Sequence, residues 1–182
     1  MGQAPGEIRD PLTPADAEGI PISSRESSMP PVVVETVSSL KEFVGREIAV
    51  TDWLKMSQER INQFAEATED RQWIHIDRER ALQESPYGTT IAHGFLTLSL
   101  LSHFMRQAIQ FRGGMKMAVN YGLNRVRFPA PVCAGSNIRA RIGLLSLEEL
   151  SDALQAVFSV VIEAEDSDKP CCVGEWVVRY YR

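Results

Sequence analysis

The sequence is poor in the residues and motifs that mark several common classes of protein. It holds three cysteines, Cys133, Cys171 and Cys172, and the last two are adjacent, which disfavours an ordinary structural disulfide between them. An odd number of cysteines without a Cys-x-x-Cys spacing argues against a disulfide scaffold and against a zinc site. We therefore expect a protein of the reducing cytoplasm.

Basic runs and long apolar runs are also missing. The formal net charge is −5, and nucleic-acid phosphates need clustered Lys and Arg. No signal peptide is visible. The most apolar segment, "GFLTLSLLSHFMRQAI", is interrupted by His103 and Arg106 and is too short to span a bilayer. We expect neither nucleic-acid binding nor membrane insertion.

No Gly-x-Ser-x-Gly motif, P-loop or dinucleotide fingerprint is present, which disfavours an acyl-enzyme hydrolase and a nucleotide enzyme. The 182 residues correspond to roughly one domain. Residues 1–31 hold six of the ten prolines and show no apolar period. This composition predicts a disordered or loosely attached arm, either a partner-binding tail or a passive extension. One folded domain is expected over residues 32–182.

Helical patterns dominate the first half of this domain. Ser57 is predicted to cap a helix over "QERINQFAEAT", and Asp77 a short helix over "RERALQES". From Gly94 to Gln110, apolar side chains occur on nearly every face, so a single helix there must be buried on all sides. We expect Gly113 and Gly114 to end it.

Strand patterns follow from residue 115 onward. The segments "NIRARIGL", "LQAVFSVVIEAE" and "CVGEWVVRYYR" alternate or are rich in Val, Ile, Trp and Tyr. The prolines of "RFPAPVCAGS" predict a loop between strands. We therefore expect an α+β fold, with three or four long antiparallel strands wrapped around one buried helix.

The stretch "EDRQWIHID", residues 69–77, carries the first candidate site. A carboxylate and an imidazole that face one water form an acid/base pair, and Asp70 and His75 are close enough in sequence for this. Spacing alone favours the alternative of a capped turn. A metal on His75 and Asp77 would need further ligands, and neither His93 nor His103 stands at a metal-binding spacing. We predict no metal site and expect Asp77 to cap the next helix.

Two further segments offer contacts for a substrate. Gly94 begins the buried helix, where free N–H groups could form an oxyanion hole, or it relieves crowding in a tight turn. His93 either orients this loop or has no role. Arg125 and Arg127 share one face of a strand, where they meet phosphates at a pocket mouth or simply face solvent.

Together, these segments resemble the MaoC-like (R)-specific enoyl-CoA hydratase family. Its signature, Gly-Asp-x-Asn-Pro-Leu-His, is followed by a helix that opens with His-Gly; here the two segments read "EDRQWIH" and "HG". The branch with nodulation protein N-like members also shares "YGTTIAHGF" and "NYGLNRVRFPAPV"-like segments. The resemblance runs from about residue 36 to the C-terminus.

The resemblance implies a hot-dog fold, a homodimer with each site between subunits, and catalytic roles for Asp70 and His75. It implies that the Gly94 N–H binds the thioester oxygen and that Ser102 supports the site. Gln72 replaces the signature's Asn and keeps a carboxamide that could orient Asp70 or close the loop. Glu69 and Trp73 also depart from the signature, and Trp73 bears on acyl-chain preference.

The implied reaction is the reversible hydration of trans-2-enoyl-CoA to (R)-3-hydroxyacyl-CoA, without a metal or redox cofactor. One alternative is dehydration of 3-hydroxyacyl thioesters on an acyl carrier protein. Another is a non-catalytic hot-dog subunit that binds acyl-CoA. A hot-dog thioesterase is a weaker option, because the central helix offers no acid.

Overall fold

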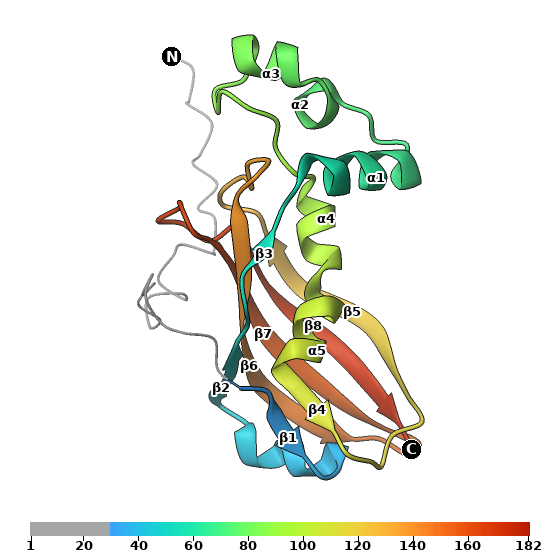
Figure 1. The fold of residues 1–182 in the computed structure, drawn as a ribbon. Helices are drawn as coiled ribbons and strands as arrows, with labels where there is room; N and C mark the ends of the chain where they lie inside the picture. Colours follow the sequence, from blue (N-terminus) through green and yellow to red (C-terminus); the bar gives the residue numbers. More distant parts are fainter. Residues whose placement is uncertain (1–29) are drawn as a thin grey trace, which may run out of the picture.

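The computed structural model describes residues 30–182 (Figure 1). Apart from Pro30 and Pro31, the predicted arm over residues 1–31 lies outside the described residues. No helix in the described part of the chain is long and apolar enough to cross a membrane.

Four long strands and two short ones form one antiparallel sheet. Its order is β2 (Arg46–Val50), β6 (Asn137–Glu149), β7 (Ala153–Ala164), β8 (Cys172–Tyr181) and β5 (Met117–Arg127), and β3 (Leu54–Lys55) also pairs with β6. Every second residue of β7 from Leu154 to Ile162 is buried, because successive side chains of a strand point to opposite faces. The predicted antiparallel strands are confirmed.

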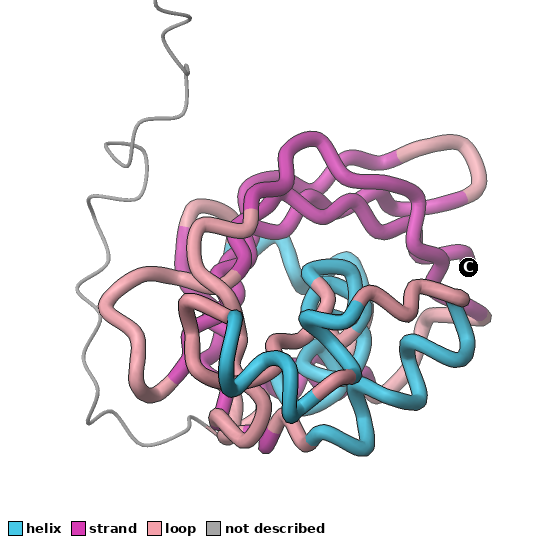
Figure 2. Tube along the Cα trace, turned by 90° about the horizontal axis from the view of Figure 1, so that it is seen from above, coloured by secondary structure: helices cyan, strands magenta, loops and turns pink. Residues whose placement is uncertain are grey.

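The sheet curls around the central helix, which lies in its concave face (Figures 1 and 2). This helix consists of α4 (Gly94–Ser99) and α5 (Leu101–Ala108). Its buried side chains pack against those of β6, β7 and β8 in one core. The predicted α+β layout with a wrapped helix is thus confirmed.

The prediction of one unbroken helix to residue 110 was wrong in two places. The Leu100 N–H bonds to the Thr97 carbonyl in a tight turn, which divides α4 from α5. The chain leaves the helix at Ile109, because β4 (Ile109–Phe111) pairs in parallel with β1 (Val32–Val34). A short 3-10 helix, η2 (Val37–Phe43), follows β1.

Burial of the helix on all sides was also predicted, and Phe95 contradicts this, since 70% of its side chain is exposed. Phe95 lies on the outer side of α4, where it meets the ring of Phe128 edge-on at a centroid distance of 6.1 Å.

Three short helices cover the end of the sheet at which α4 begins (Figure 1). They are α1 (Gln58–Thr68), α2 (Trp73–Ile76) and α3 (Arg78–Glu84). Ser57 accepts a hydrogen bond from the Arg60 N–H and Asp77 accepts one from the Arg80 N–H, so both predicted caps are confirmed. These helices carry the stretch "EDRQWIHID" to the start of the central helix.

Candidate active site

Asp70 and His75 lie between α1 and α3, beside the start of α4. Glu69 ends α1 with a φ of 60°, so the chain reverses immediately before Asp70. The segment that holds His75 is fixed to the loop before α4, because the Ile91 N–H donates to the Ile74 carbonyl at 3.0 Å. The two parts of the predicted site, one with His75 and one with Gly94, are thereby joined.

The His75 ring is oriented by one hydrogen bond. Its Nδ1 lies 2.7 Å from the Ile91 carbonyl oxygen, which can only accept, so Nδ1 carries the proton and Nε2 is free. Burial lowers the pKa of His75 below the ordinary value of 6.5; neighbouring His93 adds to this effect, and the Ile91 bond and Asp70 oppose it. A buried imidazole in its neutral form with a free Nε2 is a base.

His93 lies against both predicted catalytic residues. Its ring stacks on that of His75 with centroids 3.7 Å apart and planes 25° apart. Its Nε2 lies 2.9 Å from the backbone carbonyl of Asp70 and 3.9 Å from the Asp70 carboxylate. The sequence left the role of His93 open, and the structure places it inside the candidate site.

Asp70, His75 and His93 bring potential metal ligands within 4.8 Å of one another, but their geometry does not fit a metal. Ring nitrogens bind a metal through lone pairs that lie in the ring plane and must converge. Two rings stacked 25° from parallel direct these lone pairs side by side instead. Asp77 bonds to the Arg80 N–H, as expected of a cap.

A cavity of about 280 Å³, lined mostly by apolar residue types, opens beside His75 and the first turn of α4. Its wall is made by the predicted residues His75 and Gly94, by the loop after β5, and by side chains from α4 and the loop before it. The lining residues are His75, Tyr87, Ile91, Ala92, Gly94, Thr97, Phe128, Pro129, Ala130, Pro131, Val132 and Cys171.

Gly94 lies at the cavity, close to the ring of Phe128. A Cβ on Gly94 would lie 3.1 Å from the ring of Phe128, tighter than ordinary van der Waals contact. The first N–H groups of a helix have no acceptor inside the helix. Because Gly94 has no Cβ, a ligand oxygen can approach these N–H groups closely. The predicted oxyanion donor therefore lines the same cavity as His75.

Cys171 lines this cavity as a neutral thiol. It is buried, and burial raises the pKa of its thiol to about 11. A thiol nucleophile must be deprotonated to react, so Cys171 serves as wall rather than as nucleophile.

Asp70 and the remaining predicted residues lie outside the cavity wall. Ser102 is half-buried on α5, about two turns beyond Gly94. Gln72 is exposed at the start of α2, where its carbonyl accepts from the His75 N–H. Arg125 and Arg127 are exposed on β5, and this strand leads directly into the cavity-lining Phe128.

Trp73, expected to affect substrate shape, also lies outside the cavity wall. Its ring packs against the guanidinium of Arg80, with the Cζ 4.4 Å from the ring centroid. The bulk added at this position therefore faces α3.

Two residues that the sequence did not single out hold the backbone of His75. The Gln58 amide donates to the His75 carbonyl at 2.7 Å, and its oxygen accepts from the Thr90 hydroxyl. Gln58 comes from α1 and Thr90 from the loop before α4, so this clamp joins the two segments of the site. The sequence around Gln58 predicts only a helix capped by Ser57, so it gave no sign of this clamp.

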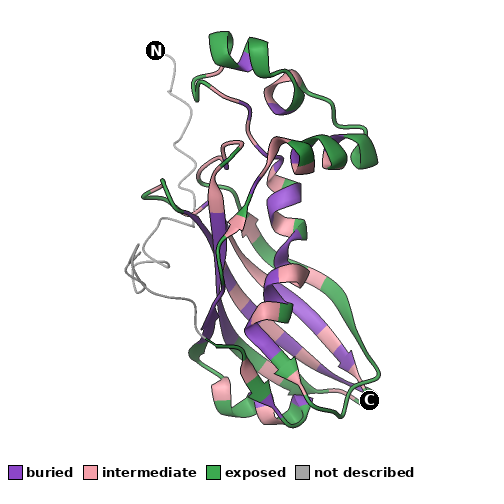
Figure 3. Ribbon diagram, viewed as in Figure 1, coloured by how far each residue is buried: buried purple, intermediate pink, exposed green. Residues whose placement is uncertain are grey.

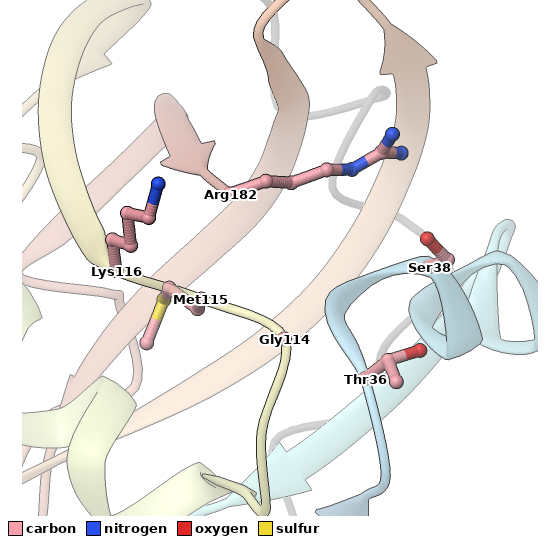
Figure 4. Close-up of a pocket in the computed structure, with 6 residues that line it drawn as sticks. All are labelled: Thr36, Ser38, Gly114, Met115, Lys116 and Arg182. Carbon is pink, nitrogen blue, oxygen red and sulfur yellow. The ribbon is translucent and has the colours of Figure 1, made fainter.

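A larger hollow of about 460 Å³ is lined by residues of η2, the segment before β5 and the C-terminus (Figure 4). These elements lie at the other end of the molecule from α1, α2 and α3 (Figure 1). The two cations of this hollow, Lys116 and Arg182, point away from each other (Figure 4). Arg182 is paired with Glu149 at 2.7 Å. None of the predicted site residues lines this hollow.

Known proteins match this chain in sequence and in structure. The family model described as "MaoC like domain" matches residues 39–163. A 3-hydroxyacyl-thioester dehydratase Z from Mycobacterium tuberculosis is 49% identical over 147 residues, which cover 80% of this chain and 96% of that relative. A nodulation protein N from Rhizobium leguminosarum bv. viciae is 42% identical over 148 residues, 78% of this chain and 89% of that relative.

Two solved structures resemble the fold. A monoamine oxidase regulatory protein from Archaeoglobus fulgius has a TM-score of 0.67 at 18% identity, covering 85% of this chain and 99% of that one. An (R)-hydratase from A. caviae involved in PHA biosynthesis has a TM-score of 0.60 at 25% identity, covering 74% and 94%. The predicted hot-dog fold is confirmed. The chain therefore belongs to the MaoC-like dehydratase family and is a hydro-lyase.

Proposed function

We propose that this protein catalyses the reversible addition of water to trans-2-enoyl-CoA, giving (R)-3-hydroxyacyl-CoA. The observation that carries this proposal is the position of His75 and Gly94 on one cavity, with Asp70 held beside His75 through His93. The cavity takes the acyl chain, and the polar groups lie at its edge.

The reaction needs a polarised thioester and a positioned water. The Gly94 N–H binds the thioester oxygen and stabilises the negative charge that develops there as water attacks the β-carbon. By analogy with other oxyanion donors, such a contact contributes about 2.7–4 kcal/mol to transition-state stabilisation. The thioester matters because its carbonyl withdraws electrons from the double bond and makes the β-carbon electrophilic.

Asp70 and His75 hold the water between them. The water oxygen forms a bond to the β-carbon, the double-bond electrons move to the α-carbon, and the α-carbon takes a proton. Because His75 enters the reaction neutral, with Nε2 unprotonated, it has no proton of its own to donate there. The proton that the α-carbon receives is therefore one that the attacking water releases. The Asp70–His75 pair takes it up as the C–O bond forms and passes it to the α-carbon, while the second proton of the water stays on the new hydroxyl.

A second copy of this chain is the partner we propose, seated on the β5 edge of the sheet. Every residue of β5 is exposed or half-buried (Figure 3), although β5 carries several large apolar side chains. Unpaired strand edges with exposed apolar residues favour association. These residues are Met117, Val119, Tyr121 and Leu123. The homodimer and a site between its subunits are what the family resemblance implies.

Arg125 and Arg127 are proposed to meet the CoA phosphates, since exposed β5 leads to the cavity. All three cysteines are free, which supports the expected reducing cytoplasm.

A second candidate function is dehydration of a 3-hydroxyacyl thioester carried by an acyl carrier protein. The name of the M. tuberculosis relative, 3-hydroxyacyl-thioester dehydratase Z, favours this direction without specifying the carrier. The same residues would act in reverse.

Steady-state rates with enoyl-CoAs of several chain lengths, and with the matching carrier-protein thioesters, test both candidates. Faster hydration of the CoA substrates, with an (R)-3-hydroxy product, supports the first. Faster turnover of the carrier thioesters supports the second. Tight acyl-CoA binding without turnover of either would indicate a non-catalytic subunit and contradict both.

A further inference from the structure

His93 is buried between the two proposed catalytic residues but does not line the cavity. Only 3% of it is exposed, and it contacts Asp70 on one side and His75 on the other. The ring of Phe64 also packs against it, at a centroid distance of 5.1 Å. A substrate in the cavity would therefore meet His75 and not His93.

The hydrogen bonds of His93 determine which nitrogen carries its proton. The Asp70 carbonyl oxygen can only accept, so the Nε2 that lies 2.9 Å from it is the donor. The buried Nδ1 has no hydrogen-bond partner among the described residues. A proton there would be a buried donor without an acceptor, which costs free energy. In this geometry His93 is a neutral donor, and its Nε2–H is occupied by Asp70.

Asp70 needs this bond because little else fixes it. It follows Glu69, where the chain reverses, and 56% of its side chain is exposed. Its carboxylate therefore has no packed surroundings that hold it toward His75. The bond from His93 fixes its backbone, and with it the point from which the carboxylate reaches the water.

The stack between His93 and His75 fixes the other member of the pair. The Ile91 carbonyl holds Nδ1 of His75, and a single hydrogen bond does not by itself fix the plane of the ring. A second ring at a centroid distance of 3.7 Å limits rotation of that plane and so directs Nε2. One side chain thus fixes both groups that hold the water.

We propose that His93 is a positioning residue, which sets the separation of Asp70 and His75 through one hydrogen bond and one ring stack. The inference rests on the proposed function, in which those two residues hold the water. It distinguishes His93 from a catalytic residue, because His93 is buried, whereas His75 lines the cavity and the Asp70 side chain is 56% exposed.

Two substitutions separate the two contacts. Phe in His93→Phe keeps an aromatic ring on His75 but cannot donate to the Asp70 carbonyl. Gln in His93→Gln loses the ring but places an amide N–H where Nε2–H was. His103→Gln is the matched control, because His103 lies on α5 and outside the cavity wall.

We expect His93→Phe to lower kcat for enoyl-CoA hydration roughly 10- to 100-fold, the effect of a small misplacement of reacting groups, with KM within about threefold. The kcat of His93→Gln should be at least about threefold higher than that of His93→Phe. His103→Gln should keep the wild-type kcat. Thermal unfolding of each variant is measured alongside, and kcat is compared only at temperatures where the variant is folded.

Equal kcat in wild type and His93→Phe would overturn the proposal, and so would a loss that appears only in KM. A nitrogen NMR spectrum at roughly pH 8 gives a reading that does not depend on turnover, with His93→Phe used to assign the His93 signals. An Nε2–H tautomer of His93 supports the proposed bond to Asp70; an Nδ1–H tautomer overturns it. If wild type turns over no enoyl thioester, the proposed function fails, and this spectrum still decides the bond.

Discussion

The Nδ1 atom of His75 lies 2.7 Å from the carbonyl oxygen of Ile91, and this bond assigns the free base at Nε2. The Ile91 N–H also donates to the Ile74 carbonyl, so both backbone polar groups of Ile91 hold the segment that carries His75. The acid/base side chain and the oxyanion glycine three residues beyond Ile91 therefore move as one unit.

The first prediction concerns the pH dependence of hydration. Burial lowers the pKa of His75 below 6.5, and the proposed reaction needs the neutral ring. Activity should therefore be full above pH 6.5 and fall as the pH drops through the lowered pKa of His75. The measurement is kcat/KM against pH by the loss of enoyl-thioester absorbance. An acidic midpoint at or above 6.5 would contradict this account of His75.

Gly94→Ala tests the fit between the helix start and Phe128. The new Cβ would lie 3.1 Å from the Phe128 ring, so the ring or the helix start must move. We expect kcat/KM to fall at least about tenfold, because the thioester oxygen and the Gly94 N–H lose their alignment. Adding Phe128→Leu should recover part of this loss.

Gly113→Ala is the control for this series, because its Cβ would meet only the Glu35 carbonyl oxygen, at 4.0 Å. It should keep wild-type kcat/KM. Wild-type activity in Gly94→Ala would show that the close approach at Gly94 has no role.

Glu69→Gly should stabilise the protein by about 1 kcal/mol. Glu69 has a φ of 60°, which costs a residue with a Cβ roughly 1–2 kcal/mol and glycine almost nothing, although glycine loses more entropy on folding. Urea unfolding measures the difference. Gln63→Gly, at an exposed position inside α1, should instead lose about 1 kcal/mol. A decrease in Glu69→Gly as large as in Gln63→Gly would contradict the strain argument.

Val119→Lys tests the proposed dimer. Val119 is 41% exposed on the β5 edge, and a lysine there would place an unpaired charge in an interface between two copies. We expect monomers by light scattering, together with loss of hydration activity if the site lies between subunits. Leu82→Lys, at a position that is 72% exposed on α3, should stay dimeric and active. A monomeric wild type would contradict the proposed assembly.

Local sequence signals predicted much of the fold. Ser57 and Asp77 cap helices because their side chains reach backbone N–H groups three residues ahead, a local interaction. The strand at Ile109–Phe111 had no such signal, since it exists only by pairing with residues 32–34 of β1. The exposure of Phe95 follows from where α4 lies relative to the sheet, which apolar content cannot show.

The same contrast between local signals and contacts made only in the fold applies to the candidate site. The family's signature indicates Asp70, His75 and Gly94 by their spacing, and their roles stay predictions. The contacts of Phe128 and of the Gln58–Thr90 clamp were not predicted, since they join residues that are far apart in sequence and meet only in the folded chain. The role of His93 depends on a ring stack and a backbone carbonyl, and residue types alone indicate neither.

The most direct test of the proposed function is the hydration rate of crotonyl-CoA, followed by absorbance, in wild type, Asp70→Asn and His75→Gln. We predict a measurable wild-type rate and a loss of at least about 100-fold in each variant, as for other acid/base groups. Rates within about threefold of wild type in both variants would contradict the assignment of Asp70 and His75.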